Sequence, residues 1–238
     1  MCKPESTLVQ TSDMTTNADT RSLKVWDLPT RLFHWSLLTM IVACWWTSTA
    51  NSDMDTHMRC GYAVLALLLF RLVWGVLGST TARFSSFVTT PRAVLHYFAS
   101  LRNKEDTPHI GHNPAGGWMV LALLLMLLLI TGSGLFANDD MMTEGPLVHY
   151  IGKHASDAAT SLHVQGFYLL LAMVALHVGA ILFYLVLKKE NLIRPMLTGN
   201  RHLPPAAEIP ALKIQNGWLA LLILGMTSGA VCLLALFA

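Results

Sequence analysis

The sequence predicts an all-α integral membrane protein whose helices cross the bilayer. Of its 238 residues, 53% are apolar and only 13% are charged, whereas a soluble domain has roughly 25% charged residues. The mean hydropathy is +0.49, and the apolar residues gather into runs close to the roughly 20 residues that span about 30 Å of hydrocarbon. Because backbone polar groups in lipid must be satisfied within their own segment, such runs predict helices.

Five runs have this length. They cover residues 32–50, 60–79, 116–137, 158–187 and 216–238. Only the second contains a charged residue, Arg71. The fourth would be about 45 Å long as a helix, so it must tilt or project from the bilayer. Helices buried in a large soluble core are the alternative, but five runs this long and this poor in charge exceed the range of core helices.

The segments outside these runs divide the chain. Residues 1–22 are polar and lack the apolar core of a signal peptide, which predicts a disordered cytoplasmic tail. Residues 23–200 are expected to form the main membrane domain, and residues 201–238 a linker with an additional C-terminal transmembrane helix. Asn113 followed by Pro114 is typical of a helix start, directly before the third run.

The distribution of basic residues predicts the orientation. Thirteen Lys and Arg residues fall on the side of the N-terminus, and only Arg59 and Lys153 fall on the other. The positive-inside rule therefore places the N-terminus in the cytoplasm. Four tryptophans are expected to anchor the interfaces, Trp26 and Trp35 on one side and Trp45 and Trp46 on the other.

The predicted outer side is acidic. It carries Asp53, Asp55, Asp139, Asp140, Glu144 and Asp157. An acidic face suits a basic soluble partner, although solvated loops explain it equally well. The net charge of +2 and the lack of a basic patch with aromatic residues argue against nucleic acid as a partner.

Cysteine usage excludes two kinds of site. The four cysteines are Cys2, Cys44, Cys60 and Cys232, and none forms a C-x-x-C pair. This argues against a zinc site and against covalently attached c-type haem. Free thiols are expected.

Four of the ten histidines lie in or beside the apolar runs: His34, His57, His163 and His177. An ionisable residue inside a membrane segment is a candidate functional residue. The other six lie in loops, where solvated side chains are expected; they are His96, His109, His112, His149, His154 and His202.

The spacing between His163 and His177 places them on one face of one helix. Fourteen residues at about 100° each return to within about 40° of the same direction, and the two rings are about 21 Å apart along the helix. One helix face therefore presents one imidazole in each half of the bilayer. This arrangement is typical of a helix that supplies an axial ligand to each of two stacked cofactors.

Depth in the membrane predicts how the histidines pair. His34 and His177 lie about 7 to 10 Å on the cytoplasmic side of the midplane, and His57 and His163 about 14 to 18 Å on the outer side. Two facing imidazoles, each about 2 Å from a metal, describe the six-coordinate iron of a b-type haem. The sequence therefore predicts two haem b groups, one per pair.

Further residues fit this cofactor arrangement. Gly61, Gly166 and Gly179 lie close in sequence to the histidines and either leave room for a porphyrin or serve ordinary helix packing. Arg71 follows His57 by fourteen residues and so reaches the level of the cytoplasmic haem. It either pairs with a haem propionate or extends to the lipid headgroups.

The residues around the histidines resemble a known family. The stretch VWDLPTRLFHW at residues 25–35 resembles the opening signature of the prokaryotic cytochrome b-561 family, which includes the cytochrome b subunit of nickel-iron hydrogenases. Other similar blocks are His57 with Gly61 and Tyr62, FRLVWG at 70–75, GHNP at 111–114, and His163 with His177, Phe183 and Tyr184. The resemblance extends from about residue 23 to about residue 200.

This resemblance implies a four-helix haem-binding bundle, to which the run at 216–238 adds a fifth transmembrane helix without an inherited role. The implied axial ligands are His34, His57, His163 and His177. Members of the family pass electrons between a redox partner and the quinone pool, ubiquinone or menaquinone, without chemistry by protein side chains. The expected partner at the outer face is a hydrogenase, a c-type cytochrome or another dehydrogenase.

Two other functions remain open. One is a stand-alone quinone-linked oxidoreductase, such as a superoxide oxidase, and the other is a haem-free membrane anchor or transporter. On the cytoplasmic side, His96, His109 and His112 are candidate proton donors, and His112 could instead contact a propionate or be solvated.

Overall fold

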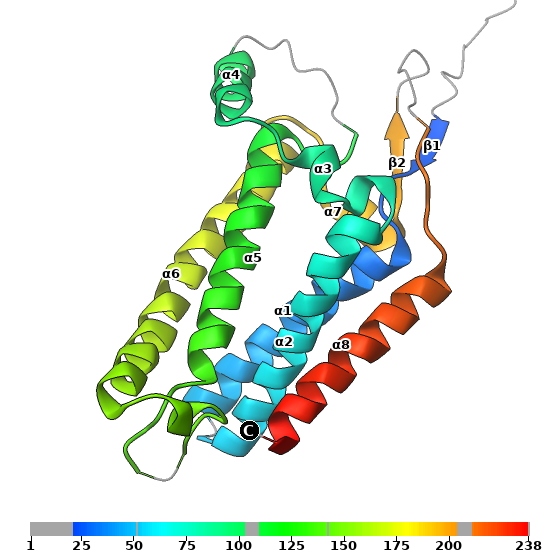
Figure 1. Ribbon diagram of the computed structural model, residues 1–238. Helices are drawn as coiled ribbons and strands as arrows, with labels where there is room; N and C mark the ends of the chain where they lie inside the picture. The colour runs from blue at the N-terminus through cyan, green and yellow to red at the C-terminus, as the bar shows by residue number, and fades with distance from the viewer. Residues whose placement is uncertain (1–20, 51, 103–109, 142, 204–210, 238) are drawn as a thin grey trace, which may run out of the picture.

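The computed structural model describes residues 21–50, 52–102, 110–141, 143–203 and 211–237. The expected tail over residues 1–22 lies almost wholly outside this part, and the first strand begins at Arg21. Five long helices dominate the described chain (Figure 1). They are α1 (Leu28–Thr49), α2 (Met54–Leu77), α5 (Pro114–Gly134), α6 (Lys153–Val186) and α8 (Gly217–Phe237).

Shorter elements connect them. They are β1 (Arg21–Lys24), η1 (Thr80–Ala82), α3 (Phe84–Phe87), α4 (Pro91–Arg102), η2 (Val148–Tyr150), α7 (Ile193–Thr198) and β2 (Asn200–Leu203). All of them except η2 lie at the end of the bundle shown at the top of Figure 1, which is the predicted cytoplasmic end.

Four described helices, α2, α5, α6 and α8, are long and apolar enough to cross a membrane. They coincide with four of the five predicted runs, and the protein is therefore a multi-pass helical membrane protein. Helix α1 covers the remaining run and has 22 residues, but Arg31, His34 and several threonines make it less apolar. Its crossing therefore remains a proposal, supported by its length and by its packing along α2 (Figure 1).

The helices pack as two pairs with one additional helix. Helix α1 lies along α2 and α5 lies along α6, while α8 packs on α2 (Figure 1). The centre of the core is α2, where Leu68 and Trp74 are completely buried, and α8 contributes the buried Ile223. Helix α6 has the smallest buried share among the four apolar helices, because it packs extensively only against α5.

Polar caps set where the helices begin. Asp53 precedes α2 and accepts a hydrogen bond from the backbone N–H of Thr56 at 3.0 Å. Asn113 accepts from the N–H of Gly116 at 2.7 Å and Pro114 starts α5, so the helix start predicted there is confirmed. Because hydropathy misses polar first turns, α1 and α2 begin four and six residues before the predicted runs, and His57 lies inside α2.

A two-stranded sheet makes the fold differ from the all-α prediction. Strand β1 pairs antiparallel with β2, with Arg21 opposite Leu203 and Lys24 opposite Asn200. The backbone N–H groups of Val25 and Trp26 continue this contact by donating to the carbonyl of Gly199 at 2.8 and 3.1 Å. Strands of four residues carry no apolar run or helical period, so the sequence pattern gave no sign of them.

Candidate cofactor-binding site

His57 and His163 face each other near the predicted outer end of the bundle. The first turn of α2, fixed by the Asp53 cap, carries His57, and the outer third of α6 carries His163. Their ring centres are 5.9 Å apart, with the ring planes at 84°. These two residues were predicted as one pair, and the structure brings them together.

Hydrogen bonds fix the proton on each of these rings. The Nδ1 atom of His57 lies 2.9 Å from the carbonyl oxygen of Cys44 in α1, and Nδ1 of His163 lies 2.8 Å from the carbonyl oxygen of Ile130 in α5. A carbonyl oxygen only accepts, so the hydrogen-bond geometry assigns the proton to Nδ1 in both rings. Each neutral imidazole keeps the Nε2 lone pair for a metal, which is the arrangement that orients histidine ligands in metal sites.

The geometry of this pair fits a bis-imidazole iron centre. A metal–nitrogen distance of about 2 Å on each side, plus about 1 Å from each nitrogen to its ring centre, separates two ligand rings by about 6 Å. The observed 5.9 Å agrees with this value. Among the described residues, no group of three or more His, Cys, Asp or Glu could hold a metal ion. The donors seen at this end are two imidazoles, a ligand set that haem iron accepts.

Gly134 makes the position of His163 possible. A Cβ atom built on Gly134 would lie 2.9 Å from both Cε1 and Nδ1 of the His163 ring, closer than real Cβ contacts. This residue was missed in the sequence, where it appears only as one of several glycines at the end of an apolar run. The carbonyls of Cys44 and Ile130 were also missed, because a backbone acceptor leaves no trace in the residue types.

The three glycines expected beside the histidines have different surroundings. A Cβ on Gly61 would meet nothing within 4 Å, so this position keeps open space. Gly166 packs against Ile130 of α5, with a built Cβ 2.9 Å from its side chain, so helix packing explains it. Gly179 also has open space, but two residues turn the helix by about 200°, which places it on the opposite face from His177.

The second predicted pair consists of His34 of α1 and His177 of α6 on the cytoplasmic side. The two imidazoles are close enough to interact electrostatically. The His34 ring also contacts Trp35 edge-on, with ring centres 5.0 Å apart. Its Nδ1 atom is buried and has no hydrogen-bond partner.

Arg71 is buried in α2 at the same end of the bundle. It is only 3% exposed, which rules out the alternative in which it extends to the headgroups. Its guanidinium lies 4.9 Å above the centre of the Phe84 ring, and its Nη1 atom is buried without a hydrogen-bond partner. The nearby carboxylate of Asp27 is already bonded, because its oxygens accept from the N–H of Thr30 and from Nε1 of Trp74 at 2.8 and 3.1 Å.

His112 is not the solvated loop residue that was expected. Its ring lies between Trp26 and Phe87, with ring centres 4.7 and 4.8 Å away, and its Nδ1 atom is buried without a partner. Burial and the neighbouring charges of Arg71 and His177 lower the pKa of His112 to about 3. Trp26 is itself only 8% exposed, so its prediction as an interface anchor is wrong.

The remaining loop histidines agree with expectation where they are described. His96, His149, His154 and His202 are exposed. His109 lies outside the described residues.

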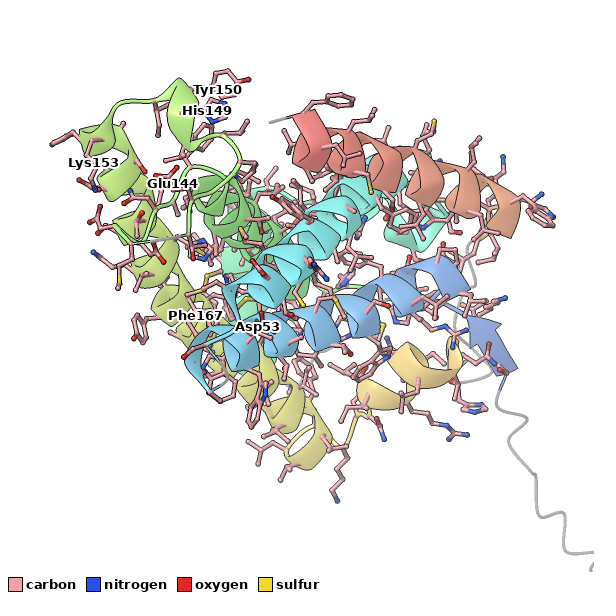
Figure 2. The ribbon with its side chains drawn as sticks, turned by 90° about the horizontal axis from the view of Figure 1, so that it is seen from below. Asp53, Glu144, His149, Tyr150, Lys153 and Phe167 are labelled. Carbon is pink, nitrogen blue, oxygen red and sulfur yellow. The ribbon has the colours of Figure 1, made fainter. Side chains whose placement is uncertain are left out.

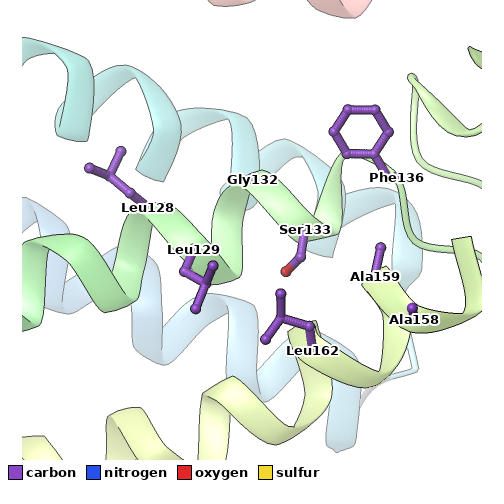
Figure 3. A pocket seen from close by; sticks show the side chains of 8 residues that line it. All are labelled: Leu128, Leu129, Gly132, Ser133, Phe136, Ala158, Ala159 and Leu162. Atoms are coloured by element: carbon purple, nitrogen blue, oxygen red, sulfur yellow. The ribbon is translucent and has the colours of Figure 1, made fainter. Parts of the chain in front are cut away.

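An open groove lies between α5 and α6 (Figure 3). It is lined by Leu128, Leu129, Gly132, Ser133, Phe136, Ala158, Ala159 and Leu162. Ser133 supplies the one side-chain hydroxyl, and it donates to the Ile130 carbonyl at 2.9 Å. The groove therefore offers apolar surface and no iron ligand.

The residues of the site lie in a segment that matches a known protein family. A family model described as prokaryotic cytochrome b561 matches residues 25–199. The matched segment covers most of the chain, including the four histidines, Arg71 and His112, and it ends before β2 and α8. No curated protein and no solved structure matched the chain.

Proposed function

Because the chain belongs to the prokaryotic cytochrome b561 family, a family of haem b-binding membrane proteins of electron transfer, we propose that it carries two haem b groups. In this proposal it relays electrons across the bacterial inner membrane between a redox protein at the outer face and the quinone pool. The N-terminus lies in the cytoplasm, in keeping with the thirteen basic residues on that side.

The observation that carries the proposal is the facing pair of His57 and His163, with ring centres 5.9 Å apart. His57 and His163 bind the outer haem through Nε2, and their Nδ1 protons are held by two backbone carbonyls. His34 and His177 bind the cytoplasmic haem. When bound, each haem iron supplies one-electron redox chemistry.

The protein's own contribution is positioning and burial, so no catalytic residue is proposed. Helix α6 holds His163 and His177 on one face about 21 Å apart along its axis, which sets the spacing of the relay. Arg71 provides a buried cation for a haem propionate. A buried guanidinium without a bonded anion is costly, and a propionate would supply that anion.

The outer surface supports a protein partner with a basic face, such as a hydrogenase or a c-type cytochrome. Asp53, Glu144 and Lys153 lie at this end, seen from below in Figure 2. Lys153 is paired with Asp140 and Asp157, so its charge is offset locally. The acidic residues that remain would attract a basic protein and repel an anion such as superoxide.

Haem content in paired variants tests the proposal. The purified protein should show b-type absorbance with two haems per chain. The variants His57→Ala and His163→Ala should each retain one haem, and the double variant should also retain one, because both residues serve the same site. His34→Ala and His177→Ala should behave as the second pair, whereas His57→Ala with His177→Ala should lose both haems.

Two results would contradict the proposal: purified protein without haem, or double variants that group the histidines differently. His96→Ala is the matched control, since this exposed histidine of α4 should leave both haems in place. Electron transfer is tested separately by mixing the protein with a quinone and either a reduced c-type cytochrome or superoxide. Transfer from superoxide alone would favour the stand-alone oxidoreductase.

A further inference from the structure

The cytoplasmic end of the bundle contains polar atoms that lack partners. Six buried side-chain atoms in the described residues have no hydrogen bond, and all belong to residues at this end of the helices. They are Thr30 Oγ1, Arg31 Nε, His34 Nδ1, Arg71 Nη1, Thr89 Oγ1 and His112 Nδ1. At the outer end, in contrast, Nδ1 of both His57 and His163 is bonded. Buried polar groups in native proteins are nearly always satisfied, so these atoms are candidates for contacts with a polar ligand.

Arg71 and His112 are the two of these residues that are equipped to bind an anion together. The Arg71 guanidinium lies over the ring of Phe84. Phe84 contacts Phe87, and Phe87 contacts His112, so these two rings link Arg71 to His112, and the two residues also interact electrostatically. Arg71 remains a cation at every physiological pH, and its ion pair with an anion would be strong in this buried position. Asp27 offsets part of the Arg71 charge, but its oxygens accept from Thr30 and Trp74, and Arg71 Nη1 has no hydrogen-bond partner.

His112 contributes a neutral N–H group. Burial favours the neutral form of His112, and a neutral imidazole still has one N–H group to donate. Trp26 and Phe87 hold the ring from two sides. Gly111, with φ of +86°, turns the chain directly before it in a conformation that favours glycine.

We infer that Arg71 and His112 together bind one carboxylate group, and that this carboxylate is a propionate of the cytoplasmic haem. Arg71 supplies the charge and His112 supplies a neutral donor. This inference rests on the proposed function and adds His112 to the haem-binding residues. A lipid anion is the other source of an acidic group at this depth, and the experiment distinguishes the two.

The test replaces the donor while keeping the ring. His112→Phe removes the N–H group, His112→Gln restores a donor, and His96→Phe is the matched control on exposed surface. In haem-loaded protein, His112→Phe should lower the midpoint potential of one haem only, because the propionate then keeps more of its negative charge near the iron. The expected change is about threefold or more in that haem's equilibrium constant for reduction. His112→Gln should recover part of it.

Arg71 gives a second set of variants. Arg71→Leu should shift the same haem further in the same direction, and Arg71→Lys should shift it less, since the charge remains. The propionate bending band in the resonance Raman spectrum should change in His112→Phe and Arg71→Leu and stay unchanged in His96→Phe. Exchanging anionic for neutral lipids in nanodiscs should leave the wild-type band and potentials unchanged.

The outcomes separate the inference from the proposed function. Wild-type protein without haem contradicts the proposed function itself. Two haems with unchanged potentials and bands in His112→Phe overturn the inference alone, as does a wild-type band that follows the lipid charge. If His112→Phe loses a haem, retention by His112→Gln supports the donor role, and equal loss in both variants overturns it.

Discussion

Individual backbone contacts define the outer histidine pair. The carbonyl oxygen of Ile130 accepts a hydrogen bond from His163 Nδ1. Gly134 leaves room for the His163 ring because it has no side chain. His57 depends in the same way on the carbonyl of Cys44. The two imidazoles are therefore the proposed iron ligands, and main-chain atoms of two other helices orient them.

The variant Gly134→Ala tests whether this glycine positions the His163 ring. In Gly134→Ala the new Cβ would lie 2.9 Å from the His163 ring, so the ring must move away from the Ile130 carbonyl. We expect the variant to lose the outer haem, reducing the haem content by about half under the proposed pairing. Gly132→Ala is the control, because its Cβ would meet nothing within 4 Å. Equal haem content in both variants, measured by pyridine haemochrome absorbance, would contradict this prediction.

The closeness of His57 and His163 could be predicted from the sequence, whereas the surroundings of His112 could not. The pairing of His57 with His163 followed from helix rise and membrane thickness, two constants that hold in any bilayer helix. The surroundings of His112 could not be predicted, because a loop residue is buried only by tertiary packing against residues distant in the chain. The surroundings of Gly166 and Gly179 could not be predicted either, because they depend on which face of the helix packs against its neighbours.

Within α2, the first turn connects the Asp53 helix cap to His57, a proposed iron ligand. Asp53 accepts from the N–H of Thr56 at 3.0 Å and from its hydroxyl at 2.6 Å. His57 follows in the same turn, with its backbone N–H donating to the Asp53 carbonyl at 2.9 Å. Loss of the cap should therefore loosen the segment that presents His57.

Asp53→Ala should lower the midpoint temperature of outer-haem loss by a few degrees, since it removes the hydrogen bonds at this helix end. Asp55→Ala is the control, because Asp55 is an exposed acid of the same turn outside the capping position. The measurement is Soret absorbance against temperature in detergent. Identical curves for the two variants would show that the cap does not hold the ligand.

The same cap predicts a pH dependence. The bonds from the Thr56 hydroxyl and backbone N–H lower the pKa of Asp53 below the ordinary aspartate value near 3.9. A carboxylate whose pKa is lowered in the folded state stabilises that state when the pH is above the ordinary pKa. This stabilisation is lost as the pH falls through the lowered pKa. Outer-haem retention in wild type should therefore decline below about pH 4, and Asp53→Asn should show less of this decline. A decline of equal size in Asp53→Asn would exclude the cap as its source.

At the scale of the whole molecule, α8 is separate from the candidate site. It packs on α2 through Ala220, Ile223, Thr227 and Val231, and the family match ends before it. It carries none of the four histidines. In a bilayer, lipid chains replace a lost helix with little hydrophobic cost.

A chain ending after Leu203 should therefore keep both haems under the proposed function. Its thermal midpoint should fall, because contacts such as the bond from the Gln215 N–H to Ser79 Oγ at 3.0 Å are lost. Haem content and Soret melting of purified protein measure both quantities. Loss of a haem on truncation would show that α8 shapes the site.

The pairing of β1 with β2 has a consequence for how the chain could be rearranged. It places the start of α1 and the segment after α7 side by side at one end of the bundle. The part of the chain that forms α1, α2, α5 and α6 therefore begins and ends at the same place. In a chain without α8, a circular permutant that begins in the loop between α5 and α6 and joins the paired strands by a short linker would keep the neighbours of α1, α2, α5 and α6. In such a protein the order of synthesis would change while the two histidine pairs kept their partners.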